Sequence, residues 1–319
     1  MKVITALLFL ISAGFSFAQT TNQTADLATI LKNAEKQTQN YREAFKNLLS
    51  EETKTFEAFD KNGNLKKRTV VESNFIVYQS ATDANVVTEF RNIFKVNGKA
   101  VGDSEKRTTE LFADIAKMGS VAVELARLQK ESSRYDKTLT INGMTLWQAM
   151  ILSEHIRPFF EFKLIRRENL NGTDTFLVEY RQTKPSPYIL ISDEQAPKEN
   201  KLTLGFDLDL PDGFDKSNVF LSGKLWIDTV TFQIRREESE VFVAKSADST
   251  VVALRSEFDY REGDFGILVP KKLAFTYFDV STKEGIVSAR LYAKATLEYA
   301  KFGKSDVEIK TNEINSPKN

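Results

Sequence analysis

Alternation of apolar and polar residues with a period of two dominates the last third of the chain. This pattern is typical of β-strands that bury one face and expose the other. It extends over the segments 219–228, 230–236, 251–260, 267–280 and 286–302, and residues 202–210 alternate just as strictly. The two longest segments are more than twice the usual strand length of about five or six residues. Strands of that length twist and coil, so we predict one highly curved antiparallel sheet.

Asn-Gly pairs predict hairpin turns in the preceding part of the chain. Asn62-Gly63 separates residues 51–59 from 65–79, and Asn171-Gly172 separates 159–167 from 175–182. A third pair, Asn97-Gly98, follows the apolar run 86–96. Asn and Gly accept the positive φ angles that tight turns require, so these segments also belong to the predicted sheet.

Three segments show the apolar spacing of a helix. Residues 24–49 form an amphipathic pattern that Thr24 can cap. The cleanest stripe begins at a cap on Asp103 or Ser104 and continues to Leu128. Residues 144–156 are ambiguous and are compatible with a helix that Pro158 ends.

These elements predict an α+β fold that is mostly β. Its long antiparallel strands curve into an open, incomplete β-barrel, and two or three helices cover the mouth, because the apolar face of the sheet needs a partner layer. We expect a single domain over residues 19–319, with 184–200 as the candidate linker.

The first 18 residues predict a cleavable secretory signal peptide. Lys2 supplies the positive charge, an apolar run follows, and the small residues Ser16 and Ala18 precede a cleavage site between Ala18 and Gln19. The apolar run is shorter than the roughly 20 residues that a membrane span needs. We therefore expect an exported protein without a membrane span, periplasmic or extracellular.

Composition narrows the function classes. The chain has no cysteine, which excludes disulfides, a thiolate zinc site and a lipidated cysteine. The 44 basic and 44 acidic residues balance, so nothing favours a nucleic-acid partner, which needs an excess of positive charge. The 24 phenylalanines suit a large β core.

Two short motifs carry a resemblance to a known family. The sequence Gly223-Lys224-Leu225-Trp226-Ile227-Asp228, followed by Phe232-Gln233-Ile234-Arg235-Arg236, resembles a hairpin of the lipoprotein-sorting (LolA/LolB-like) half-barrel superfamily. Ile267-Leu268-Val269-Pro270 and Leu297-Glu298-Tyr299-Ala300-Lys301-Phe302 resemble uncharacterised exported bacterial proteins assigned to the same fold. The resemblance implies an open half-barrel that holds acyl chains or another apolar ligand. The chain is longer than a typical sorting carrier, and no arginine matches the family's gating position.

Catalytic and metal-binding signals are weak. His155 is the only histidine, and we interpret it as a helix-end residue near the C-terminal dipole. Asp207, Asp209, Asp212 and Asp215 form a weak candidate calcium site. The loop that begins at Asp60 fails as a calcium loop because its twelfth position is Val71 rather than Glu. No phosphate loop or nucleophile elbow is present, so we expect neither a cofactor nor an enzyme.

The apolar strand faces are the candidate ligand site, although such faces more often form a filled core than a pocket. The predicted lining residues are Leu202, Leu204, Phe206, Leu225, Ile227, Val230, Phe232, Ile234, Leu273, Phe275 and Tyr277. The leading hypothesis is a non-catalytic periplasmic carrier or chaperone for a lipid, a lipoprotein acyl chain or another apolar ligand. The alternative is an envelope interaction module that binds a protein partner by strand addition.

Overall fold

The structure, a computed structural model, describes residues 26–304 except 81, 84–85, 137–142, 193, 200, 247–248 and 285. The predicted signal peptide and its cleavage site between Ala18 and Gln19 lie outside the described residues.

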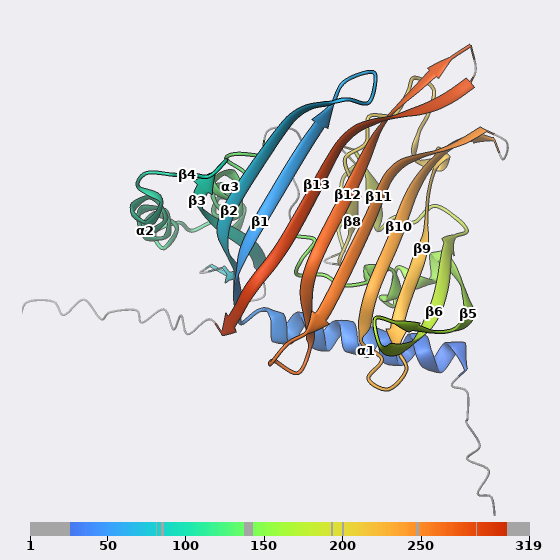
Figure 1. Cartoon of the computed structure of the whole chain (residues 1–319), viewed down its shortest axis with the longest axis horizontal. Helices are drawn as coiled ribbons and strands as arrows, with labels where there is room; N and C mark the ends of the chain where they lie inside the picture. Colours follow the sequence, from blue (N-terminus) through green and yellow to red (C-terminus); the bar gives the residue numbers. More distant parts are fainter. Residues whose placement is uncertain are drawn as a thin grey trace, which may run out of the picture.

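One curved antiparallel sheet of eleven strands forms the body of the protein (Figure 1). Its order is β4-β3-β2-β1-β13-β12-β11-β10-β9-β6-β5, and its two edge strands do not pair, so the described sheet stays open. The strands are β1 (Leu48–Phe59), β2 (Leu65–Gln79), β3 (Val87–Val96), β4 (Lys99–Ala100), β5 (Phe160–Leu170), β6 (Thr173–Gln182), β9 (Val219–Asp228), β10 (Ile234–Ser246), β11 (Ser249–Glu262), β12 (Leu268–Lys283) and β13 (Ile286–Lys304). The prediction of an open, mostly β barrel is confirmed.

Register shifts interrupt most of the strand pairs and explain part of the curvature. They occur, for example, between Leu49 and Glu51 in β1 and between Ile234 and Arg236 in β10. Such bulges bend a strand and increase its twist. In the predicted turns Asn97-Gly98 and Asn171-Gly172, both residues have positive φ. In the β1–β2 turn, only Gly63 of the Asn-Gly pair has positive φ.

Helix α1 (Leu27–Phe45) crosses one end of the strands (Figure 1). The side chain of Asp26 caps it by accepting a hydrogen bond from Thr29 N at 2.8 Å. Its aromatic residues pack on the inner face of the sheet, with Tyr41 against Tyr260 and Phe45 against Phe75, each at a centroid distance of 6.0 Å. The helix therefore covers one part of the apolar face.

Irregular chain covers another part of that face. It contains the 3₁₀ turns η1 (Met150–Leu152) and η2 (Arg157–Phe159), and the short parallel strands β7 (Ile189–Ile191) and β8 (Leu204–Phe206). A third 3₁₀ turn, η3 (Lys216–Asn218), precedes β9. The predicted helix over 144–156 is therefore wrong, and the predicted long strand over 202–210 is reduced to three residues.

The predicted helix that ends at Leu128 is two helices, α2 (Ser104–Ile115) and α3 (Val121–Ser132). The chain between them contains Gly119, which has low helix propensity. Both helices contact β3 and share a small apolar cluster with Tyr78 and Phe90. They lie at the β3–β4 end of the sheet (Figure 1), away from the main core.

Candidate functional site: a cavity on the inner face of the sheet

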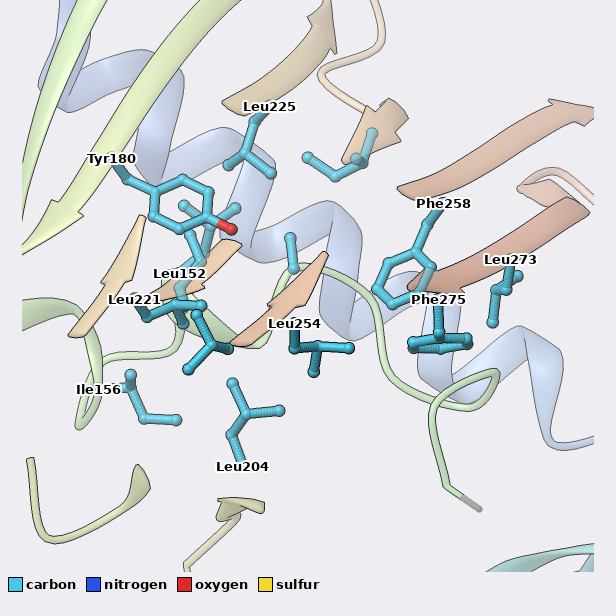
Figure 2. Close-up of a cluster of buried hydrophobic side chains, with 14 of the residues drawn as sticks. Leu152, Ile156, Tyr180, Leu204, Leu221, Leu225, Leu254, Phe258, Leu273 and Phe275 are labelled. Atoms are coloured by element: carbon cyan, nitrogen blue, oxygen red, sulfur yellow. The ribbon is translucent and has the colours of Figure 1, made fainter. Parts of the chain in front are cut away.

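A cavity of about 160 Å³ lies between the inner face of the sheet and the covering chain. Strands β6 and β9–β12 supply Tyr180, Leu221, Leu254, Phe258, Phe275 and Tyr277. The covering side consists of residues 144–151 and 204–207. Figure 2 shows several of these side chains projecting from the strands, with Leu204 lying beside Leu221 and Leu254. Most of the lining is apolar, as expected for a site that binds a small molecule.

Polar groups gather at one place on the strand side of the cavity. Glu237 on β10 is 7% exposed, and its Oε2 accepts a hydrogen bond from Ala149 N at 3.1 Å. Ser239 and Ser256 lie beside it in the lining, with their hydroxyl oxygens 2.6 Å apart. The cavity therefore combines apolar walls with a buried carboxyl group.

Gly223 brings the ring of Tyr180 close to this place. A Cβ atom at Gly223 would overlap both the hydroxyl of Tyr180 and the carbonyl oxygen of Glu238. The hydroxyl of Tyr180 in turn donates to that carbonyl oxygen at 3.4 Å. Only glycine permits this approach of a side chain to the neighbouring strand.

Burial raises the pKa of Glu237 from its ordinary value of 4.5 to about 7, and the hydrogen bond from Ala149 N offsets only part of this effect. Burial also raises the pKa values of Tyr180 and Tyr260 well above normal, and the nearby charge of Glu237 adds to the shift. Both phenols are therefore neutral at physiological pH, and Glu237 is the group that titrates there.

A cluster of buried charged side chains lies further along the inner face. The guanidinium of Arg91 on β3 bonds both carboxylate oxygens of Glu52, at 2.7 and 2.9 Å, and one oxygen of Glu89 at 2.9 Å. These three side chains are at most 1% exposed. Although burial alone raises the pKa of Glu52, the charge of Arg91 holds it below its usual value.

The same ion cluster fixes the start of the covering chain. Glu89 Oε1 accepts hydrogen bonds from Thr145 N at 2.7 Å and from Leu146 N at 2.9 Å. The carboxyl of Glu237 binds Ala149 N in the same way. Ala149 itself has a φ of 42°, outside the helical region. Two buried glutamates on the sheet thus bind the backbone amides of Thr145, Leu146 and Ala149, and the positive φ of Ala149 is incompatible with a continuous helix through this segment.

The structure brings together only some of the predicted lining residues. Leu204, Phe206, Phe275 and Tyr277 line the cavity. The fully buried Leu225, Ile227, Ile234 and Leu273 belong to the packed core. Neither Phe232 nor Leu202 lines this cavity. Phe232 stacks on Phe176 at a centroid distance of 6.4 Å, and the carbonyl oxygen of Leu202 accepts a hydrogen bond from His155. Val230 is 82% exposed, so its prediction is wrong: it follows Asp228 in a tight turn.

Glu237 is not among the residues predicted from the sequence, although the alternation of buried and exposed residues along β10 can locate it. Val241 and Val243 are buried on the inner face, and stepping back by twos from them reaches Ser239 and Glu237. The register shift between Ile234 and Arg236 then changes the phase of the strand. Because Ile234 is also buried, a pattern that starts from it places Glu237 on the wrong face.

The β9–β10 hairpin motif, residues 223–228 and 232–236, has a structural role in this protein. Asp228 accepts hydrogen bonds from Val230 N at 2.9 Å and Thr231 N at 2.8 Å, and Arg235 pairs with its second oxygen at 2.8 Å. Asp228 therefore closes the β9–β10 turn. Trp226 faces the other side of the sheet, where Arg236 lies over its ring at 5.5 Å from the centroid.

The other candidates do not form a metal or catalytic site. Nowhere in the described part of the chain do three His, Cys, Asp or Glu side chains gather as a metal site requires. Asp207 lies at the cavity, whereas Asp215 caps η3 through Ser217 N at 2.7 Å; Asp209 and Asp212 are exposed. His155 lies between η1 and η2, not at a helix end, and donates from Nε2 to Leu202 O at 2.8 Å.

No helix in the described ranges is long and apolar enough to span a membrane. No family model matches the chain, and no curated protein matches it in sequence.

Among solved structures, the chain is similar to an outer membrane lipoprotein-sorting protein domain from Vibrio parahaemolyticus. The TM-score is 0.38 and the identity 10%, over 89% of this chain and 95% of that one. A DUF1329 family protein from Desulfovibrio piger gives a TM-score of 0.30 and 12% identity, over 87% and 94%. The MucA/MucB complex of Pseudomonas aeruginosa gives 0.20 and 9%, over 84% and 94%. Similarities at these TM-scores carry no argument about function.

Proposed function

We propose that this protein is a non-catalytic carrier or chaperone of the bacterial envelope that shelters an apolar ligand in its open half-barrel. The observation that supports this proposal is the largely apolar cavity between strands β6 and β9–β12 and the covering chain. A cavity of about 160 Å³ is close in size to a cavity of about 150 Å³ that is known to bind benzene.

The volume also limits what fits. In this arrangement the cavity admits a ligand part of about the size of one aromatic ring. A long acyl chain needs the covering residues 144–151 and 204–207 to move away from the sheet. The proposal therefore covers a small apolar ligand in the arrangement that the structure shows. It covers a lipid or lipoprotein acyl chain once the covering residues have moved away from the sheet.

Extraction of the protein from the envelope tests the proposal. Full-length protein purified from the envelope is analysed by native mass spectrometry, and its apolar ligands are extracted and identified. We expect a bound apolar molecule in the wild type and a reduced amount in Ser256→Met, because the larger side chain at residue 256 fills part of the cavity.

A neighbouring substitution provides the control. Arg255 is 57% exposed on the other face of β11, where it pairs with Glu240 at 2.6 Å. Arg255→Met therefore adds an apolar side chain outside the cavity and should leave the bound ligand unchanged. A wild-type protein without ligand, which also fails to bind added toluene, would contradict the proposal.

A second function is favoured by the edge of the sheet. Strand β5 ends the sheet order and pairs with β6 alone among the described strands. An eleven-residue edge strand offers free backbone groups to an added strand of a protein partner. Crosslinking from residues of β5 in the envelope tests this alternative, and a Pro substitution in β5 should abolish any crosslinked partner without changing ligand binding.

A further inference from the structure

The charges around the cavity are of one sign. Its lining contains two carboxylates, the buried Glu237 and the exposed Asp207, and no Lys, Arg or His among the residues that the structure describes there. Among the lining residues an anionic head group would therefore meet only like charge, since the nearby Arg42 lies over the ring of Trp147. A ligand with a positive charge or a strong hydrogen-bond donor would meet a complementary one.

The carboxyl group of Glu237 offers a free side to such a donor. The one protein hydrogen bond identified for it comes from Ala149 N and uses Oε2. A buried carboxylate with a single donor is costly unless a further partner reaches it. The cations of the chain that lie nearest in sequence, Arg235 and Arg236, pair elsewhere, with Asp228 and with Glu238 and Glu257.

The walls of the cavity suit a cation as well. Tyr180, Phe258, Phe275 and Tyr277 line it from the strands, whereas the ring of Trp147 on the covering chain already lies under the guanidinium of Arg42, at 3.9 Å from the centroid. Aromatic rings attract an ammonium group through their faces, and the attraction grows when water is excluded. The hydroxyls of Ser239 and Ser256 add acceptors beside the carboxyl.

We propose that the cavity selects a lipophilic amine, whose apolar body fills the space between the strands and β8 and whose ammonium group binds Glu237. This inference rests on the proposed function and deepens it by naming the ligand class. A free fatty acid is disfavoured by the same two carboxylates, although its hydrocarbon part suits the walls.

Four probes with the same ring separate the head group from the apolar body. Toluene, benzyl alcohol, benzylamine and benzoate are titrated into the full-length protein at about pH 8, where Glu237 is largely ionised and the amine is protonated. We expect benzylamine to bind at least about tenfold more tightly than toluene, which corresponds to about 1.4 kcal/mol. Benzyl alcohol should lie between them, and benzoate should bind more weakly than toluene.

Two variants identify the group responsible. In Glu237→Gln the charge is lost but the amide oxygen can still accept from Ala149 N, so the preference for benzylamine should fall below about threefold while toluene binding is kept. Glu240→Gln makes the same change on the same strand but on the outer face, where Glu240 pairs with Arg255, and should keep the full preference.

The possible outcomes separate the amine assignment from the proposed carrier function. Equal binding of toluene and benzylamine, or a preference that survives in Glu237→Gln, overturns the amine assignment and leaves the apolar carrier intact. Failure of every probe to bind overturns both. If Glu237→Gln does not fold, binding of the same probes to the wild type is measured at two pH values. The preference for benzylamine should disappear as the pH falls from about 8 to about 5, whereas toluene binding should not change.

Discussion

Replacing Arg91 by Met tests how strongly the buried ion cluster stabilises the fold. The substitution keeps most of the side-chain length and removes three charge-assisted hydrogen bonds, of 2.7 to 2.9 Å, to Glu52 and Glu89. Both carboxylates stay buried, at most 1% exposed. Glu89 keeps its bonds from Thr145 N and Leu146 N. Glu52 loses the two hydrogen bonds from Arg91 and keeps only the charge of nearby Lys54 and the hydroxyl of Tyr299, so it carries most of the uncompensated charge.

The expected cost follows from this geometry. Removing one partner of a buried ion pair costs about 3–5 kcal/mol, because the other charge loses its compensation. We therefore expect Arg91→Met to lower the free energy of unfolding by about 4 kcal/mol. Adding Glu52→Gln should recover part of this loss, with a coupling energy of about 1–3 kcal/mol.

Urea unfolding followed by circular dichroism measures these changes. Arg68→Met is the matched control, because Arg68 on the neighbouring strand β2 is 61% exposed and lies 3.9 Å from Glu57. Exposed pairs of this kind contribute about 1 kcal/mol or less. A loss in Arg91→Met that is no larger than in Arg68→Met, or strict additivity with Glu52→Gln, would refute the assignment of a stabilising buried cluster.

Two further substitutions test the cavity. Because the folded state raises the pKa of Glu237 from 4.5 to about 7, it holds a proton that the unfolded chain releases, and stability falls as the pH rises through that window. A rise in pKa from 4.5 to about 7 corresponds to a loss of about 3 kcal/mol in the free energy of unfolding. In Glu237→Gln this loss should be absent from unfolding curves measured between about pH 4 and 8. A variant whose free energy of unfolding depends on pH as in the wild type would show that Glu237 is not the titrating group. Gly223→Ala should lower the free energy of unfolding by about 1–3 kcal/mol, since its Cβ overlaps Tyr180 and the adjacent strand; Gly205→Ala, which meets no atom within 4 Å, is the control in the same assay, and equal costs would contradict the close approach.

Local patterns determined most of the sheet. The period-two alternation of residues 251–260 and 286–302 appears as β11 and β13, because one face of each strand is buried and the other is solvated. Asn97-Gly98 and Asn171-Gly172 form turns with positive φ, a preference that resides in the residues themselves. The sequence by itself was therefore sufficient for a long, curved, antiparallel sheet.

Tertiary structure decided what covers that sheet and where the candidate site lies. Residues 144–156 have helical spacing, but the carboxylates of Glu89 and Glu237 bind the amides of Thr145, Leu146 and Ala149, and Ala149 has a positive φ. The alternation of residues 202–210 leads to only three residues of β8, because their strand partner is the short β7 and not the large sheet. The side of β10 that Glu237 occupies depends on a register shift. Each of these outcomes depends on contacts between residues far apart in the chain, which a periodic pattern along the sequence does not contain.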